Sequence, residues 1–268
     1  MKAGGGPMSV LALEIAGVRL DLLASGGVES SGLNRYRAFA GAAGPAAFTL
    51  WLGSEAGPAV GGTELRVVER GGRWCVAGAE DAGWLDPANG TGEVRGGAGG
   101  LFLDALIRSA VGAAVLSRGG LLVHAAAVVV DDAAHLFPAR SGSGKSTLAS
   151  RAAHPLSDEI SAVLPASVGF WAHATPWWTS RGGSAPLARV YALAWGGEGV
   201  EPARGSALRQ LAGNLVLPLD SPANRARALG AAAAVAHCVP FARLAFRPDS
   251  DVERLLRRSP ASPTSAAG

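Results

Sequence analysis

The segment Ala139–Thr147, which reads Ala-Arg-Ser-Gly-Ser-Gly-Lys-Ser-Thr, constrains the fold of this chain more than any other. It has the spacing of a phosphate-binding P-loop, in which a glycine-rich turn joins a buried strand to a helix. Lys145 is one of only two lysines in the chain, the other being Lys2. A compact ammonium on a flexible stem reaches between two phosphates, whereas a planar guanidinium does not fit the same space. The segment therefore predicts a strand–loop–helix unit that binds phosphate.

Two apolar runs lie directly before this segment and predict the strands that lead into it. Leu121–Val130 is apolar and rich in β-branched residues, interrupted only by His124, which is typical of a buried strand. Asp131-Asp132 predicts a turn, and Ala134–Phe137 predicts the strand that enters the loop. Strand, glycine-rich loop and helix form the context in which such a motif is meaningful.

The helix behind the loop is expected to be short. Its pattern predicts Thr147–Ala153, and His154-Pro155 ends it because proline cannot continue a helix. From Leu156 we expect the chain to return as a strand parallel to the one before the loop, through a crossover near the minimum length. This returning strand carries Asp158 and Glu159.

The loop offers the groups that a nucleotide phosphate needs. Backbone amides from Ser141 to Ser146 converge into an anion-binding nest, and Gly142 and Gly144 allow the backbone to approach closely. Ala139 stands where the usual pattern has its first glycine, and a positive φ there would cost alanine about 1 kcal/mol or more. The residues expected to contact ATP are Ala139, Arg140, Ser141, Gly142, Ser143, Gly144, Lys145, Ser146 and Thr147.

An acidic pair and a histidine complete the expected site. A carboxylate at the end of the returning strand can hold Mg²⁺ or accept a proton, so Ser146, Asp158 and Glu159 are the expected metal ligands. Asp158, His124 and Lys145 are the expected catalytic residues, with Asp158 accepting the proton. The alternatives stay open: acidic residues at strand ends are common turn formers, and a histidine in an apolar strand is often a satisfied core residue.

Three stretches of the chain together resemble a known family. Residues 119–125 (Gly-Gly-Leu-Leu-Val-His-Ala), 136–147 and 156–159 are similar to the catalytic core of HPr kinase/phosphorylase-related proteins, and the resemblance covers roughly Leu103 to Pro176. It implies a fold like that of the nucleotide-binding phosphoenolpyruvate carboxykinases, with His124, the P-loop and the acidic pair in the active site. It also implies transfer of phosphate from ATP, with Mg²⁺, to a Ser or Thr hydroxyl of a peptide or small protein.

The chain departs from that family in ways that bear on its activity. Its acidic pair is Asp-Glu rather than Asp-Asp, and no Glu-Ile-Arg-Gly-like motif follows, which argues against phosphorylase activity and recognition of HPr itself. Arg181 is the nearest candidate for a phosphate clamp, and equally an ordinary turn residue. A non-catalytic ATP-binding module and a small-molecule kinase remain alternatives. A transport-type ATPase is disfavoured because the chain has no LSGGQ-like signature.

Composition divides the chain into four parts. Residues 1–8 and 259–268 are expected to be disordered. Residues 9–100 consist of short apolar runs separated by glycine-rich turns, notably at residues 61–62 and 71–72, and predict a small, mostly antiparallel β module. Residues 101–258 form the expected P-loop domain with a mixed sheet. The fold class is therefore α/β, or α+β over the whole chain.

The P-loop domain is expected to open with a helix and to close with a further set of elements. The opening helix has an apolar stripe from Leu103 to Val115, with Arg108 and Ser109 off it. Later runs predict strands at 189–195 and 242–246 and helices at 206–215, 223–236 and 252–258.

Charge and cysteine usage exclude several classes of function. The formal net charge is only +3, and no basic stripe is interleaved with aromatic residues, so nucleic-acid binding is not expected. No charge-free stretch is long enough to span a bilayer. Cys75 and Cys238 are isolated, which predicts neither a zinc site nor a disulfide framework. We expect a cytoplasmic protein, and a homo-oligomer is compatible with the sequence.

Overall fold

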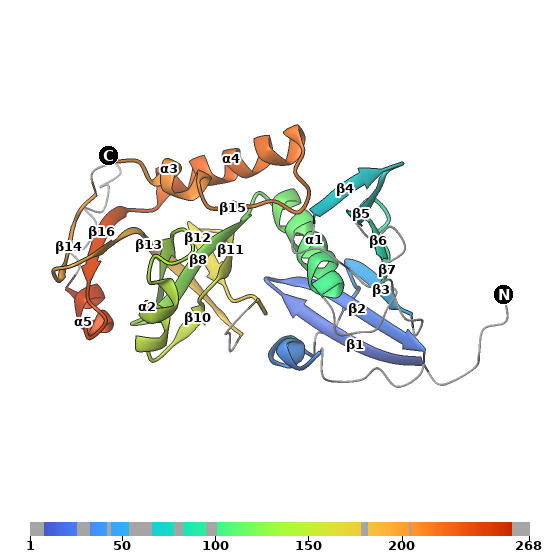
Figure 1. Ribbon diagram of the computed structural model, residues 1–268, viewed down its shortest axis with the longest axis horizontal. Helices are drawn as coiled ribbons and strands as arrows, with labels where there is room; N and C mark the ends of the chain where they lie inside the picture. Colours follow the sequence, from blue (N-terminus) through green and yellow to red (C-terminus); the bar gives the residue numbers. More distant parts are fainter. Residues whose placement is uncertain are drawn as a thin grey trace. The chain divides into compact units, whose positions relative to one another are not determined.

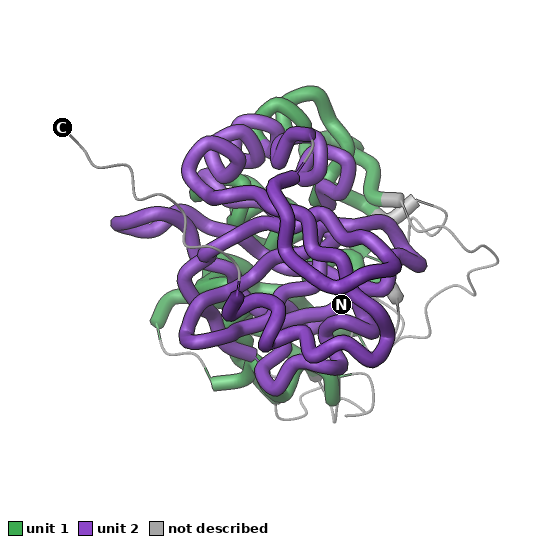
Figure 2. Tube along the Cα trace, turned by 90° about the vertical axis from the view of Figure 1, so that its left-hand side faces the viewer, with its two compact units in different colours: residues 1–118, 217–227 green, residues 119–216, 228–268 purple. Residues whose placement is uncertain are grey.

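A computed structural model describes most of the chain. The described residues are 8–25, 33–41, 44–53, 66–77, 83–94, 101–177, 182–203 and 205–258. They form two mixed sheets and several helices, so the fold is α/β (Figure 1). The chain divides into two compact units, the first made of residues 1–118 and 217–227 and the second of residues 119–216 and 228–268 (Figure 2). This boundary lies after Arg118, whereas the sequence places one at residue 100.

The first unit contains a seven-stranded sheet in the order β1-β2-β3-β7-β6-β5-β4. Its elements are β1 (Met8–Ile15), β2 (Val18–Ser25), the 3-10 helix η1 (Asn34–Phe39), β3 (Phe48–Leu52), β4 (Arg66–Arg70), β5 (Arg73–Ala77), β6 (Gly83–Asp86), β7 (Thr91–Val94) and α1 (Leu101–Ser117). The β2–β3 and β3–β7 pairs are parallel, and the other described neighbours are antiparallel. The expected turn at residues 61–62 lies outside the described residues.

Helix α1 turns an apolar stripe inward, as its sequence pattern predicts. The fully buried members of the stripe are Leu103, Leu106, Ile107, Ala110, Val111 and Val115. Ser109, which the pattern places off this stripe, is nevertheless buried. Its hydroxyl donates a hydrogen bond of 3.0 Å to the carbonyl of Pro218, which satisfies the polar group away from water.

The second unit is built on two long strands that change partners along their length. Its elements are β8 (Leu121–Val130), β9 (Ala133–Pro138), α2 (Lys145–Arg151), β10 (Pro155–Ser157), β11 (Ile160–Pro165), β12 (Phe170–His173), β13 (Ser184–Trp195), β14 (Gly199–Pro202), α3 (Ala207–Ala212), β15 (Leu215–Val216), the part of α4 (Pro222–Cys238) from residue 228 onward, β16 (Phe241–Phe246) and α5 (Val252–Arg257). β8 pairs first with β11 and β15 and then with β9 and β10. β13 begins beside β12 and continues between β9 and β16, parallel to both.

One predicted helix of this unit is too long. The pattern predicts a helix to residue 215, but α3 ends at Ala212 and Leu215 lies in β15. Leu215 pairs with Val123 of β8, so a tertiary strand contact overrides the local helical pattern. Within the described ranges, no helix has the length and apolar character needed to cross a membrane.

The strands around the glycine-rich loop follow the prediction. β8 and β9 form a hairpin whose two-residue turn is Asp131-Asp132, with φ of +50° and +61°, a conformation that Asp tolerates better than most side chains. β9 and β10 are both antiparallel to β8, so they run in the same direction, as a crossover requires. The acidic pair occupies the bend between β10 and β11 rather than the end of one continuous strand.

Helices α2 and α5 cover one face of the sheet over β8, β9, β13 and β16 and close the core of the second unit. Its buried residues include Val128, Phe137, Leu148, Tyr191, Leu244, Phe246, Val252 and Leu256. Phe137 of β9 stacks on Tyr191 of β13 with ring centroids 5.1 Å apart, and the Tyr191 hydroxyl lies 3.1 Å from Nδ1 of His135. Burial lowers the pKa of His135 to about 4, so this histidine is neutral near pH 7 and belongs to the core. These contacts hold β9, and with it the start of the loop, against β13.

Candidate functional site

The glycine-rich loop connects Pro138 at the end of β9 to Lys145 at the start of α2. Gly142 and Gly144 have φ of +77° and +94°, a region that glycine adopts without a steric penalty. The described non-glycine residues with positive φ are Ala16, Asp131 and Asp132, so the backbone at Ala139 carries no such strain. The alanine in place of the usual glycine is therefore compatible with this loop conformation.

The first turn of α2 leaves backbone donors free of helical partners. Within α2, Leu148 donates to the carbonyl of Gly144 at 2.9 Å. The amides of Lys145, Ser146 and Thr147 precede this bond and have no intrahelical acceptor. Together with the loop they offer several N–H groups to an anion.

Lys145 is held in place by the loop itself. Its side chain is 4% exposed, and its Nζ donates to the carbonyls of Ala139 at 2.9 Å and Arg140 at 3.0 Å. An ammonium has three donors, so one is left for a ligand. Burial lowers the pKa of Lys145, and the nearby negative charges of Glu159 and Asp158 act in the opposite direction. The acidic pair therefore helps to keep this buried ammonium protonated.

The hydroxyl of Ser143 is a buried polar group close to the glycine-rich loop's turn. Its Oγ is inaccessible to water and has no hydrogen-bond partner among the described residues. A buried hydroxyl without a partner costs about 1–3 kcal/mol. Ser143 is not among the residues that line the hollow at the loop, so its hydroxyl is not one of the groups that a ligand there would contact.

His124 and Glu159 form a half-buried pair beside the loop. The Nε2 atom of His124 lies 2.7 Å from Oε1 of Glu159. Strand pairing positions them, because His124 of β8 lies opposite Ile160 of β11 and the amide of Ala125 donates to the carbonyl of Glu159 at 3.0 Å. The histidine that interrupts the apolar strand thus contacts a carboxylate of the acidic pair.

The two members of the acidic pair have different surroundings. Glu159 is among the residues that line the hollow at the loop, whereas Asp158 is 7% exposed and is not part of that lining. Asp158 still acts on the site through its charge, which raises the pKa of Lys145. The structure thus brings Lys145, Glu159 and His124 together and leaves Asp158 adjacent to them.

The hollow at the loop has a volume of about 250 Å³. Its lining residues are Ser141, Gly142, Gly144, Lys145, Ser146, Thr147, Glu159 and Trp195. Most of the residues expected to bind ATP therefore surround one space, with an acidic group at its side. Arg181 lies outside the described residues.

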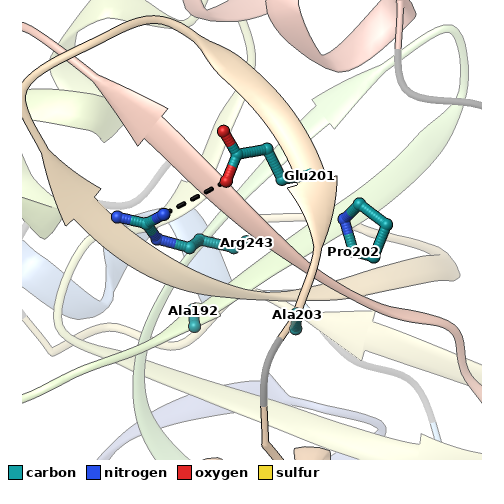
Figure 3. Close-up of a pocket in the computed structure, with 5 residues that line it drawn as sticks. All are labelled: Ala192, Glu201, Pro202, Ala203 and Arg243. Atoms are coloured by element: carbon teal, nitrogen blue, oxygen red, sulfur yellow. Dashed lines mark hydrogen bonds and ion pairs between the residues drawn. The ribbon is translucent and has the colours of Figure 1, made fainter.

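Two other hollows in the second unit do not suit a phosphate. One of about 390 Å³ lies over β13, β14 and β16, where Arg243 and Glu201 pair at 3.1 Å (Figure 3). The other, of about 440 Å³, has three carboxylates in its lining, and Arg257 contacts two of them, Asp131 and Glu253. In the first hollow Glu201 already neutralises the charge of Arg243. In the second the three carboxylates outnumber the one arginine, so neither hollow attracts a phosphate.

A comparison of the chain with models of known protein families finds no match. A comparison with curated proteins finds none either.

Trp195 is a lining residue whose place in the site the sequence does not predict. In the sequence it is only the last residue of an expected strand, directly before two glycines. In the structure it is 50% exposed, the most exposed of the described tryptophans, and its ring lies beside Gly144. No local signal connects it to the loop, because its position depends on which strand lies next to β13.

Gly144→Ala is expected to destabilise the chain more than Gly142→Ala. Positive φ costs alanine about 1–2 kcal/mol at either position. At Gly144 an added Cβ would also lie 2.5 Å from Cζ2 of Trp195 and 3.0 Å from Cζ of Phe246, which adds about 1–3 kcal/mol of overpacking. At Gly142 no surrounding described atom lies within 4 Å of that Cβ. Urea unfolding should give a lower midpoint for Gly144→Ala, and equal midpoints would contradict the contact with Trp195.

Proposed function

We propose that this chain is an ATP- and Mg²⁺-dependent phosphotransferase of the HPr kinase-related type, acting on a Ser or Thr hydroxyl of a peptide or small protein. One observation carries the proposal: a single hollow holds both the ammonium of Lys145 and the carboxylate of Glu159, which is paired with His124. A kinase needs a cation for the phosphates and an acceptor for the hydroxyl proton. A module that only binds ATP needs the first and not the second.

The loop side of the hollow is suited to the phosphates of ATP. The amides of residues 144–147 and the one donor left on Lys145 are available to negatively charged oxygens. Because these donors are in place before the ligand arrives, they stabilise charge on the phosphoryl group without reorganising. Their arrangement supports reading the loop as the P-loop that the sequence predicts.

The acidic side of the hollow is suited to the acceptor hydroxyl. During transfer the bond from the γ-phosphorus to the bridging oxygen of the β-phosphate breaks, and a new bond forms to the substrate hydroxyl oxygen. Glu159 takes the hydroxyl proton, and ADP leaves. His124 orients the Glu159 carboxylate through its 2.7 Å contact. This proposal gives Glu159 the role that the sequence alone assigns to Asp158, because Glu159 lines the hollow.

The oxygen atoms of the site fit Mg²⁺. Among the described residues, no group of three or more His, Cys, Asp or Glu side chains is able to hold a metal ion. Mg²⁺ bound with a nucleotide needs only one or two carboxylates, because phosphates and water complete its octahedron. The Ser146 hydroxyl and the Glu159 carboxylate line the hollow and would hold the ion, with the predicted ligand Asp158 beside them but outside the lining. The ion would neutralise charge on the phosphoryl group.

Phosphoryl transfer is tested directly with the full-length protein. Wild type and Lys145→Ala are incubated with [γ-³²P]ATP, Mg²⁺ and a panel of Ser- and Thr-containing peptides, and the label on each peptide is counted. We expect label from the wild type alone. Equal labelling by both proteins would refute the proposal. Tight ATP binding with no transfer to any acceptor would favour the non-catalytic module instead, and transfer only to small alcohols would favour a small-molecule kinase.

A further inference from the structure

We propose that Trp195 is the platform on which the base of the nucleotide stacks, and that the site takes purine nucleoside triphosphates without distinguishing adenine from guanine. The inference rests on the proposed function, since it needs the phosphates to occupy the loop. It adds a subsite for the base and a nucleotide specificity.

Strand order brings Trp195 to the loop. β9 and β13 are parallel neighbours, so their carboxyl ends meet at the same edge of the sheet, where ligands of α/β proteins usually bind. β13 pairs with β9 as far as Val190 and then continues beside β16 as far as Trp195. The glycine-rich loop leaves β9 at this edge, and Trp195 lines the same hollow as Lys145 and Thr147.

The indole of Trp195 is held rigidly from behind. It stacks on Phe246 with ring centroids 4.8 Å apart and an interplanar angle of 29°, and Phe246 is 1% exposed in the core. Gly144 leaves no room for even a methyl group beside the ring. Half of Trp195 nevertheless remains accessible. An aromatic surface that is fixed in advance binds a flat ligand with little further loss of entropy.

The other residues that line the hollow indicate which part of the ligand stacks on Trp195. The polar groups that line the hollow belong to the loop and to Glu159. In the proposed function the loop groups bind the phosphates, and Glu159 accepts the proton of the substrate hydroxyl. Trp195 is the single aromatic group among the described lining residues, and it lies directly beside the phosphate loop. A purine has an extended π-face, and stacking is tolerant of base identity because every base has such a face.

The lining also explains the expected lack of base discrimination. Reading adenine against guanine requires donors and acceptors at the base edge, since an unpaired polar group is what rejects the wrong partner. The polar side chains of the described lining are those of Ser141, Lys145, Ser146, Thr147 and Glu159. In the proposed function they serve the phosphates, the ion and the hydroxyl proton rather than the base edge. Stacking therefore adds affinity for both purines alike.

The test compares three probes by calorimetry: ATP, GTP and inorganic tripolyphosphate. We expect Trp195→Ala to weaken ATP and GTP binding by roughly 5- to 150-fold, the usual effect of losing one stacked base, and to leave tripolyphosphate binding unchanged. Trp195→Phe should restore most of the affinity for both purines. Trp171→Ala is the matched control, because Trp171 is 37% exposed in the same unit and is not among the residues that line the hollow. Wild type should bind ATP and GTP within about threefold of each other.

The outcomes separate the base platform at Trp195 from the proposed function on which it rests. Equal losses for tripolyphosphate and ATP in Trp195→Ala would show a structural role and overturn the platform, and so would unchanged ATP binding in that variant. A strong preference of the wild type for one purine would overturn the lack of discrimination. If the wild type binds neither ATP nor tripolyphosphate, the phosphate site fails, and the proposed function fails with it. Binding of both probes without any effect of Trp195→Ala overturns the base platform alone.

Discussion

Lys145→Ala is expected to lower kcat/KM for phosphoryl transfer by about 10²–10³-fold, the usual loss when one group that stabilises transition-state charge is removed. Lys145 is the one cation among the described residues that line the hollow. Two of its hydrogen bonds go to loop carbonyls, so the ammonium is in position before the phosphates arrive. Alanine removes the charge and leaves those carbonyls facing an apolar methyl group.

Two further variants separate the shape of this cation from its charge. Lys145→Arg keeps the charge, but we expect it to lose most of the activity because the side chain is 4% exposed and a planar guanidinium needs more room. Lys2→Ala removes the other lysine of the chain and should leave activity unchanged. Labelled peptide measures transfer, calorimetry measures ATP affinity, and thermal unfolding checks that each variant is folded. Full activity in Lys145→Arg would contradict the proposed fit of a compact ammonium.

Glu159→Gln is expected to lower kcat by about 10²–10⁴-fold, the range for loss of a general base. Glutamine keeps the shape of the side chain and can still contact His124, but its amide does not accept a proton at neutral pH. The Kd for ATP should change by less than about tenfold, since the loop side of the hollow is untouched. Kd is measured without Mg²⁺, so that loss of a metal ligand does not enter the comparison.

Asp158→Asn is the matched variant at the neighbouring position. Asp158 is buried and is not part of the hollow lining, and its charge helps to keep Lys145 protonated. We therefore expect a smaller loss of kcat than for Glu159→Gln. A larger loss in Asp158→Asn would return the proton-accepting role to Asp158, and full activity in both variants would exclude the acidic pair from catalysis.

The elements around the loop were predictable because their causes are local. A turn at Asp131-Asp132 and apolar runs on either side of it depend on residues a few positions apart, and β8 and β9 lie where those runs predict. α2 spans Lys145–Arg151, two residues earlier at each end than the pattern predicts. Helix ends are set by capping and by the loop conformation, which a periodic pattern does not resolve.

Elements whose limits depend on distant partners were harder to predict. The helical pattern at 206–215 continues through Leu215, but pairing of Leu215 with Val123 of β8 ends the helix early. β6, β7, β12 and β14 are short and are stabilised mainly by their neighbours in the sheets. Such strands have little local signal of their own, because strand preference depends on the packing of the faces.

The glycine-rich loop with its lysine, the apolar strand pair before it and the acidic pair after it are all predictable from sequence, because each is a contiguous motif. Tertiary structure decided which groups share a hollow. It brings His124 to Glu159, 35 residues away, and Trp195 to Gly144. Both contacts depend on strand neighbours and register, and a slip of one residue would turn each side chain to the opposite face of the sheet.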